Sequence, residues 1–538
     1  MNTNRWFIAF VLLFAVTIFM NAEPAYLLLL TVAQMVFVPV MLIQLLGRKK
    51  LLNIAIMVGV ASVFILQITE KTPWDAWFAL GYLFYTLIVA CYGCGRFLRR
   101  GFSQIEEFMI DAAMMFLSIG GFWTFASITG FNTGFSPMIT WLTAIHFHYA
   151  SFLLPIFVGL LGRTYKPRYY PLKGTILLAA PILTAIGITF SVWLELLSVA
   201  FYIVGIYAVI ILSFKTRLSS LIQTALIRIS FSGVGLTIIF SLLYAISNST
   251  GLFNVGIPFM LVFHGVTNCL AFGAVGVIGW SLAIPERKFL PPIPISKIRG
   301  QLVVGETGIQ PYLSKETKRG LVDEFTIYQL VDVPTSIQDF YLHTEDYRLF
   351  SSVRWKFWFK PLAFVYSWFS RRVKQLNLPY DGKWVEMTGS IQSIDSIVDG
   401  RISPRAWIRK IGKDEVFVAL YSHHVEKDSA YMNIALPLPK SSMIGILRLY
   451  MEQEKLILSS ESNDETSAGI YIAVGNHLPK LPLTERFTVW ELETGVLKAI
   501  HQMKLFNIPF LTIHYEIFHK EQLPSAYCPN GQLEGQGL

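Results

Sequence analysis

Long apolar stretches separated by short polar breaks run through the first half of the chain. About 20 mostly apolar residues in a row are enough for a helix to cross a bilayer, and the sequence contains ten stretches of this kind. They predict an all-α bundle of about ten transmembrane helices over residues 1–282. The predicted spans are 6–22, 25–46, 51–69, 74–96, 107–129, 138–161, 175–191, 193–214, 225–247 and 257–281.

Two of these spans leave alternatives open. Only residues 191–195 interrupt the seventh and eighth spans, so this region predicts either a tight hairpin or one long bent helix. The first span is also compatible with a cleaved signal peptide, because Arg5 precedes an apolar core and Ala22 supplies a small residue after it. The arrangement of the later spans is the same in both readings of the first.

The basic residues predict how the bundle is oriented. In a ten-span arrangement, every Lys and Arg of residues 1–282 except Lys71 falls on the same side. By the positive-inside rule that side is cytoplasmic, which predicts a multi-pass cell-membrane protein with both termini in the cytoplasm. A nine-span arrangement would place Lys215 and Arg217 outside, which argues against it. The loops on the opposite side carry Glu23, Glu70, Asp75 and Glu195.

Composition separates the chain into two chemically different halves. The whole chain is only 15% charged, against about 25% for soluble globular proteins. Residues 1–282 carry 15 Lys and Arg against 7 Asp and Glu, whereas the remaining residues carry 29 against 28. The net charge of +9 therefore belongs to the membrane half. No nucleic-acid partner is predicted, because such binding needs a basic soluble face.

Polar residues inside the predicted spans are the first candidates for function. Ionisable groups in a bilayer are costly and tend to face the interior of the bundle. One histidine of the sixth span and one of the tenth lie about eight residues from the outer ends of their spans, roughly 12 Å deep. Residues three and four positions apart share a helix face. The candidate intramembrane site comprises His146, His148, His264, Thr267 and Asn268.

The sequence leaves three interpretations of this site open. It can be a set of structural hydrogen bonds, a ligand or proton site, or a metal site. His146 and His148 point about 200° apart on a helix, so only one of them can face His264. Glu195 is a conceivable third metal ligand but lies at a shallower level. No cofactor is predicted, and a metal ion on these histidines is the alternative.

A stretch rich in aromatic and basic residues follows in the second half. Eight of the fifteen residues from Trp355 to Phe369 are aromatic, and no acidic residue occurs from Arg348 to Lys374. The stretch could pack as a core helix inside a β-structure. Clustered Trp and the missing acids favour a helix lying on the inner leaflet of the membrane. The candidate membrane-interface residues are Arg354, Trp355, Lys356, Trp358, Lys360, Trp368, Arg371 and Arg372.

The remaining pattern predicts a Pro-rich linker at 283–300 and a cytoplasmic α+β domain at 301–538. That domain is predicted to be helical over 320–378 and β-rich over 384–520, with a flexible tail at 521–538. The β-rich part suggests an antiparallel sheet, possibly a barrel, and barrels of about eight strands can hold one small ligand. It contains no GxSxG, P-loop or HExxH motif. The predicted strands are 406–411, 415–422, 431–436, 443–451, 456–459, 469–474, 487–493, 497–505 and 509–518.

Three segments resemble the YndJ-like family of bacillar multispan membrane proteins. They are His146–Ala150 after a Thr-rich turn, His264–Asn268 in the last span, and Phe340–Pro379 in the soluble half. The family has no established activity. The resemblance therefore implies a bacterial membrane protein and assigns no catalytic residue.

Taken together, the sequence favours a non-enzymatic protein that binds, senses or moves a hydrophobic or lipid-like ligand. Its partners would be the lipid bilayer and that ligand, and the sequence predicts no oligomeric state. An intramembrane metal-dependent enzyme using the histidines of the sixth and tenth spans is the first alternative. A structural or envelope-stress membrane protein without a small ligand is the second.

Overall fold

The computed structural model of this chain describes residues 3–20, 24–47, 49–252, 255–288, 292–461, 466–493 and 495–522. Contacts within the chain define two compact units. The first, here the helical unit, comprises Met1–Phe97 and Gln104–Lys288. The second, here the barrel unit, comprises Leu98–Ser103 and Phe289–Leu538. Most of the tail predicted at 521–538 lies outside the described residues.

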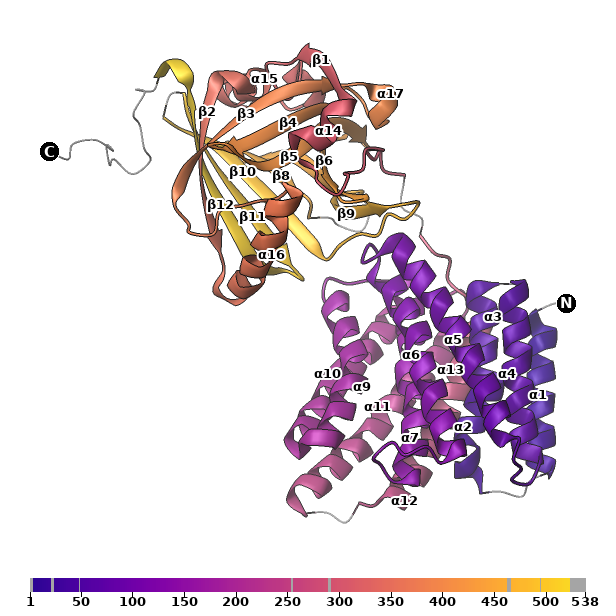
Figure 1. The fold of residues 1–538 in the computed structure, drawn as a ribbon. Coiled ribbons are helices and arrows are strands. Elements are labelled where there is room, and N and C mark those ends of the chain that lie inside the picture. Colours follow the sequence, from indigo (N-terminus) through magenta and orange to yellow (C-terminus); the bar gives the residue numbers. More distant parts are fainter. Residues whose placement is uncertain are drawn as a thin grey trace. The chain divides into compact units, whose positions relative to one another are not determined.

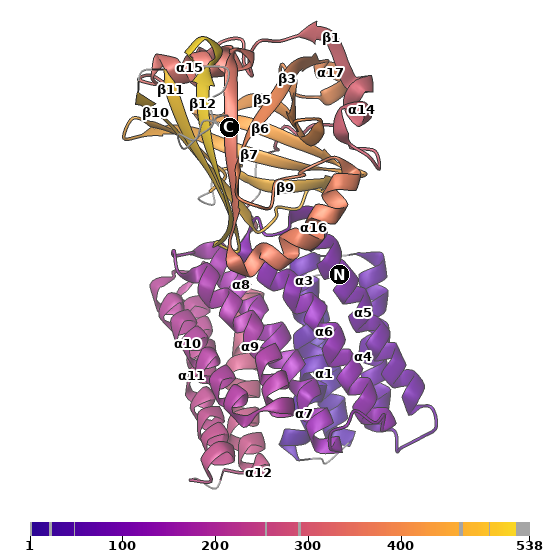
Figure 2. The same cartoon turned by 60° about the vertical axis from the view of Figure 1, so that its left-hand side comes forward.

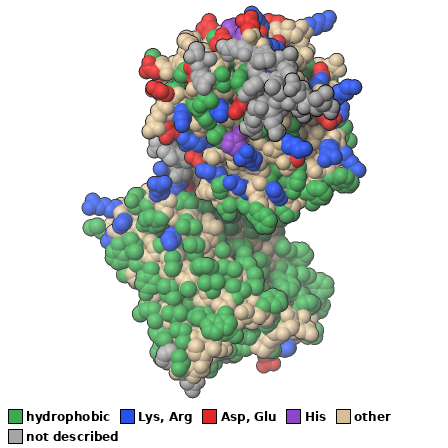
Figure 3. Space-filling view, turned by 90° about the vertical axis from the view of Figure 1, so that its left-hand side faces the viewer, with side chains coloured by type: hydrophobic (Ala, Val, Ile, Leu, Met, Phe, Trp, Pro, Cys, Tyr) green, Lys and Arg blue, Asp and Glu red, His purple; other side chains and the backbone are tan. Residues whose placement is uncertain are grey.

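In the part of the chain that the structure describes, the helical unit is a bundle of long helical passes (Figure 1). Among the described residues, nine passes are long and apolar enough to cross a membrane, and the apolar part of α1 is shorter. Figure 3 shows hydrophobic side chains covering most of the visible face of this unit. The predicted membrane bundle is thus confirmed. Its passes are α1 (Thr3–Met20), α2–α3 within Ala25–Leu46, α4 (Lys50–Ile68), α5 (Asp75–Arg100), α6 (Ile105–Thr129), α7–α8 within Pro137–Thr164, α9 (Tyr170–Phe190), α10 (Val192–Lys215), α11 (Leu221–Thr250) and α12–α13 within Ile257–Leu282.

The seventh and eighth predicted spans form a hairpin and not one bent helix. Helix α9 ends and α10 begins at Ser191, whose backbone is extended. The turn is tight enough that a Cβ on Gly187 would lie 2.5 Å from the backbone nitrogen of Glu195. Real Cβ atoms do not approach backbone this closely, so the hairpin requires glycine at this position.

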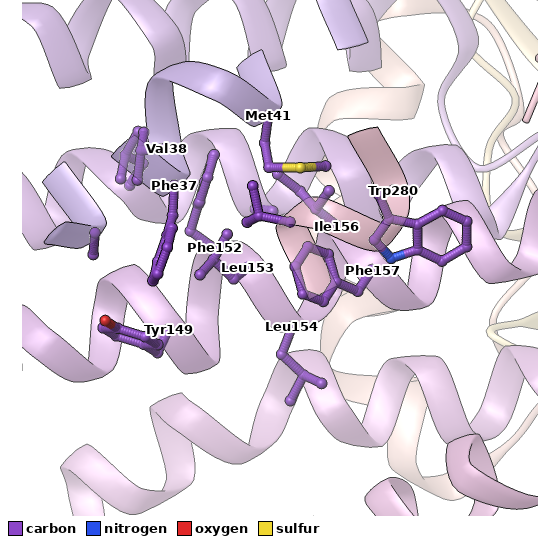
Figure 4. Close-up of a cluster of buried hydrophobic side chains, with 14 of the residues drawn as sticks. Phe37, Val38, Met41, Tyr149, Phe152, Leu153, Leu154, Ile156, Phe157 and Trp280 are labelled. Carbon is purple, nitrogen blue, oxygen red and sulfur yellow. The ribbon is translucent and has the colours of Figure 1, made fainter. Parts of the chain in front are cut away.

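Large side chains from distant passes interlock in the middle of the bundle (Figure 4). The ring of Phe157 on α8 packs edge-on against Phe272, with ring centroids 5.2 Å apart. Phe37 and Tyr149 meet in the same manner at 6.1 Å, and Trp280 on α13 is fully buried. These contacts fix the relative positions of the passes that carry the polar site.

The barrel unit is built from antiparallel strands that close on themselves (Figure 2). In the part of the chain that the structure describes, ten strands pair in the order β3–β2–β12–β11–β10–β8–β7–β6–β5–β4, and β4 pairs back to β3. β1 extends along β3 and β9 along β7. The predicted antiparallel domain is confirmed as a barrel. The strands are β1 (Leu313–Thr317), β2 (Tyr347–Trp355), β3 (Trp384–Ile394), β4 (Arg405–Ile411), β5 (Asp414–Glu426), β6 (Ser429–Leu438), β7 (Ser441–Glu452), β8 (Lys455–Ser459), β9 (Gly469–Val474), β10 (Leu483–Glu493), β11 (Val496–Leu505) and β12 (Ile508–His519).

Two apolar clusters stabilise the barrel unit. The first lies on the inner face of the strands and includes Val353, Leu447 and Ile513. The second lies on the outer face of β4 to β7 and includes Ile298, from the segment predicted as a Pro-rich linker. Ser296 in that segment donates a hydrogen bond to the buried carboxylate of Asp399 at 2.6 Å. The end of the predicted linker is therefore part of the folded barrel unit.

Residues 320–378 are not largely helical as predicted. They hold two α-helices, α15 (Thr335–Leu342) and α16 (Lys360–Val373), on either side of strand β2, together with three short 3-10 helices. β2 pairs with β12, more than 150 residues away in the chain. Pairing between strands so far apart in the chain leaves little signal in the local sequence. The aromatic residues around Trp355 also left β2 without a recognisable strand pattern.

Candidate functional site

A cavity of about 330 Å³ lies inside the helical unit. Its walls come from the passes containing α2, α6, α7, α9, α10, α11 and α12, and most of the lining side chains are aliphatic or aromatic. Polar side chains also reach the walls. They include His146, Glu195, Ser241, Tyr244, His264 and Asn268.

His264 is held by a closed network of hydrogen bonds. Its Nδ1 lies 2.9 Å from the carbonyl oxygen of Thr237, so this nitrogen carries the proton and donates it. Its Nε2 accepts from the side-chain amide of Asn268 at 3.2 Å. The amide oxygen of Asn268 accepts from the Thr237 hydroxyl at 2.6 Å. Both ring nitrogens of His264 are used, which leaves no free lone pair for a metal ion.

His146 and His148 face different surroundings, as their spacing predicts. Nδ1 of His146 lies 2.9 Å from the Leu142 carbonyl oxygen, and its ring lines the same cavity as His264. The ring of His148 is fully buried away from the cavity, where its Nε2 accepts a hydrogen bond of 2.6 Å from the Tyr82 hydroxyl. The structure therefore brings His146 and His264 to one site and places His148 outside it.

The last pass departs from a regular α-helix around the site. Met260–Val266 and Asn268–Ala274 are π-helical, a geometry that is rare and often found at functional sites. Hydrogen bonds in a π-helix join residues five positions apart, so the faces expected for an α-helix change. Asn268 stays beside His264, whereas Thr267 is not among the residues that line the cavity.

Glu195 also reaches this cavity, although the sequence placed it at a shallower level. It lies in the first turn of α10 and its carboxylate accepts a hydrogen bond of 3.1 Å from the Asn248 amide. One signal for its importance was visible in the sequence. Glu195 is the only acidic residue between Asp111 and Glu286.

A second polar cluster lies at one end of the helical unit. Glu107 on α6 accepts from Arg96 on α5 at 2.8 Å and from Arg163 on α8 at 2.5 Å. Asp111 is buried and accepts from Arg96 at 2.6 Å, and Glu106 pairs with a lysine. Ion pairs that join three helices in this way are structural cross-links.

The cavity can do a limited set of things chemically. Among the described residues, no group of three or more His, Cys, Asp and Glu side chains is placed to hold a metal ion. The cavity instead offers a largely apolar volume with a few hydrogen-bonding groups on its walls, which is typical of sites for small, mostly apolar molecules.

The aromatic and basic stretch forms an exposed helix on the barrel unit. Of the residues in α16, only Ala363 and Ser370 are buried, so α16 is not the core helix that was one of its two interpretations. Phe364 is 67% exposed and Trp368 is 58% exposed. Trp355 and its neighbour Arg354 belong to β2, and the Trp355 ring stacks on Phe359 instead of facing outward. The helical and neighbouring candidates that remain are Lys356, Trp358, Lys360, Trp368, Arg371 and Arg372.

Comparison with known proteins gives the chain a family. The family profile described as "YndJ-like protein" matches residues 28–272. The "Uncharacterized membrane protein YndJ" of Bacillus subtilis (strain 168) is 37% identical over 461 residues, which cover 83% of this chain and 84% of that protein. No solved structure matches the chain. Since the similarity extends through the helical bundle and most of the barrel, this chain belongs to the YndJ-like family of membrane proteins.

Proposed function

We propose that this membrane protein binds a hydrophobic or lipid-like ligand in the cavity of the helical unit, in order to sense or move it. The observation that carries the proposal is the cavity of about 330 Å³ with mostly apolar walls. A ligand pocket of this kind usually has a few polar groups that orient the bound molecule. His146 is the best candidate for such a group, because its Nδ1 is engaged by a backbone carbonyl and its Nε2 has no other partner among the described contacts.

The ligand chemistry follows from these walls. An apolar chain in the cavity would supply the van der Waals contacts that the aliphatic and aromatic walls lack when the cavity is empty. A hydroxyl or ester group on the ligand could hydrogen-bond to His146, while Glu195 and the His264–Asn268 pair are already engaged within the protein. The proposal therefore favours a neutral or weakly polar head on the molecule bound here.

The test uses the full-length protein, purified gently from a membrane-containing host and analysed by native mass spectrometry. The variant Ile188→Trp enlarges a side chain that lines the cavity. The control Ile182→Trp makes the same change on the same helix at a similarly exposed position that does not line it. We expect a lipid-sized adduct in the unmodified protein and in the control, and its loss in Ile188→Trp. Equal occupancy in all three proteins, or an empty unmodified protein, would contradict the proposal.

We also propose that α16 lies against an anionic lipid surface. Its support is the combination of exposed rings with Lys360, Arg371 and Arg372, each of which contributes about 1 kcal/mol near such a surface. Exposed hydrophobic patches rimmed by charge commonly mark interaction sites. The basic ends of the predicted spans favour the cytoplasmic leaflet as this surface.

This second proposal is tested with spin labels on the full chain in lipid nanodiscs, in a background without native cysteines. Val365→Cys places the label on α16, and Val331→Cys places it on an exposed loop of the same unit. Oxygen, which concentrates in lipid, should reach the label at 365 in nanodiscs that contain anionic lipid and less so in neutral ones. The label at 331 should not distinguish the two. Water-like accessibility at 365 in both lipids would refute membrane contact by α16.

A further inference from the structure

The inner face of the barrel carries buried polar atoms without hydrogen-bond partners. They are Oγ of Ser351 on β2, Nε of Arg409 on β4 and Nε2 of His501 on β11. The strand register puts all three on the inner face, opposite Tyr515, Phe417 and Phe487 respectively. Buried polar atoms are nearly always paired in folded proteins. Nε2 of His501 has the carboxylate of Glu485 at 3.7 Å as an ionic neighbour, so the atoms on Ser351 and Arg409 are the ones that indicate a missing partner.

Arg409 is the most demanding of the three. It is 7% exposed, and its guanidinium carbon lies 3.5 Å from the ring centre of Phe417 and 4.3 Å from that of Trp407. One terminal nitrogen reaches the Tyr421 hydroxyl at 3.4 Å. Among the described residues, no carboxylate lies within ion-pair distance of this guanidinium. A buried cation is costly when it has no counter-ion, so a bound anion would stabilise it.

The groups around Arg409 define the charge of that anion. Glu485 also faces this interior, and its carboxylate lies 3.7 Å from Nε2 of His501, which is within ion-pair distance. Burial raises the pKa of Tyr421 and Tyr515, so both hydroxyls stay protonated and can donate. One uncompensated positive charge beside two hydroxyl donors matches a single negative charge. Glu485 would repel a doubly charged head.

The interior also has apolar surface left for a chain. On β6, the inward side chains of Ile434 and Leu436 are only partly buried, whereas the outward Ala435 between them is fully buried. The same inversion occurs on β7, where inward Met443 is partly buried and outward Ile444 is fully buried. Further along β7 the inward Leu447 is fully buried, so the exposed part of the inner wall lies at one end of these strands. Apolar inner wall therefore remains accessible to a small molecule.

We propose that the barrel unit binds an amphipathic monocarboxylate of the long-chain fatty acid class. The carboxylate accepts hydrogen bonds from Nε of Arg409 and from the hydroxyls of Tyr421 and Tyr515, while the alkyl chain lies along Ile434 and Leu436. Charge-assisted bonds of a guanidinium to a carboxylate are among the strong ones in proteins. This site is separate from the cavity of the helical unit, and the inference goes beyond the function proposed for that cavity.

The experiment measures tritiated palmitate binding to the delipidated full-length protein, with unlabelled hexadecanol and hexadecyl phosphate as competitors. Arg409→Gln removes the guanidinium. Lys410→Gln is the matched control, because it removes the next cation of β4, which faces outward and pairs with Glu306 at 2.6 Å. Tyr515→Phe keeps the ring and removes one donor, so it tests the site even if Arg409→Gln fails to fold.

The expected palmitate affinity falls about tenfold or more in Arg409→Gln and several-fold in Tyr515→Phe. It stays unchanged in Lys410→Gln and in the cavity variant Ile188→Trp. Hexadecanol and hexadecyl phosphate should both compete less well than palmitate. Absence of saturable palmitate binding, equal competition by hexadecanol, or full affinity in both Arg409→Gln and Tyr515→Phe would overturn the proposal. Loss of binding in Ile188→Trp alone would also overturn it, while supporting the cavity of the helical unit as the binding site.

Discussion

A buried ion pair in the barrel unit allows a quantitative test of how that unit is held together. The carboxylate of Asp399 accepts from Nε of Arg401 at 2.6 Å, from its Nη2 at 3.1 Å and from the Ser296 hydroxyl. The guanidinium also donates to Asn433 on β6 and to the carbonyl oxygen of Leu420 on β5. The two ionic side chains are 0% and 1% exposed. The pair thus links the entering segment to two strands of the barrel.

The substitution Asp399→Asn keeps the shape of the side chain and leaves the guanidinium buried without a counter-ion. Removing one partner of a buried pair costs about 3–5 kcal/mol. Because a tenfold change corresponds to about 1.4 kcal/mol, the most protected amides of β5 and β6 should exchange roughly 100 to several thousand times faster. Hydrogen–deuterium exchange of the full-length protein measures this directly, since its peptides report the barrel unit separately from the helical unit.

The matched control is Asp395→Asn, four residues earlier. Asp395 is exposed and caps α17 (Ser396–Asp399) by accepting from the backbone nitrogen of Ile397 at 2.8 Å. Asn caps a helix about as well as Asp, so this change should alter the opening free energy by less than about 0.5 kcal/mol. Equal acceleration of exchange in Asp399→Asn and Asp395→Asn would refute the argument that the buried charge is what matters.

Three further outcomes follow from local geometry. Gly187→Ala should destabilise the α9–α10 hairpin and lower the yield of monodisperse protein in size-exclusion chromatography, whereas Gly95→Ala, which has open space around it, should not. Glu107→Gln removes the buried carboxylate that the partly buried Arg96 and Arg163 share, and should lower the melting temperature of the detergent-solubilised protein. Burial lowers the pKa of the His424 imidazole, although the neighbouring Glu426 acts in the opposite direction. The neutral imidazole therefore contributes stability above about pH 6.5, and this contribution is lost as the pH falls through the lowered pKa. His424→Phe, which keeps the stacking on Tyr431, should flatten the dependence of barrel-unit melting on pH below 6.5.

Local periodicity predicted most of the elements because each one carries its own signal. The predicted strand at 469–474 coincides with β9, and the strand predicted at 487–493 lies within β10 (Leu483–Glu493). The apolar pattern alone did not decide between a hairpin and a bent helix at Ser191, and the distribution of basic residues favoured the hairpin. What makes the turn tight is the close approach of Gly187 to the next helix. That approach is a tertiary contact, so no pattern along the chain reveals it.

In the polar site of the helical unit, too, the sequence predicted one part of the arrangement and packing decided the rest. Helical phase predicted that only one of His146 and His148 can face His264, but which of the two does so depends on packing. Tyr82 provides a buried hydrogen-bond partner for His148 on the opposite side, and this leaves His146 to the cavity. Thr267 was misplaced because the sequence gives no warning of the π-helical turns around it.

The interior of the barrel was inaccessible to sequence reasoning for a topological reason. A strand with alternating side chains does not tell which face is inside until its neighbours are known. Arg409 lies between Ile408 and Lys410, and a basic residue in such a strand is most simply assigned to the solvent side. Closure of the barrel between β3 and β4 reverses that assignment, because it turns Trp407 and Arg409 inward and Lys410 outward. The cation that could select an anionic ligand therefore becomes recognisable only when the ring of ten strands is complete.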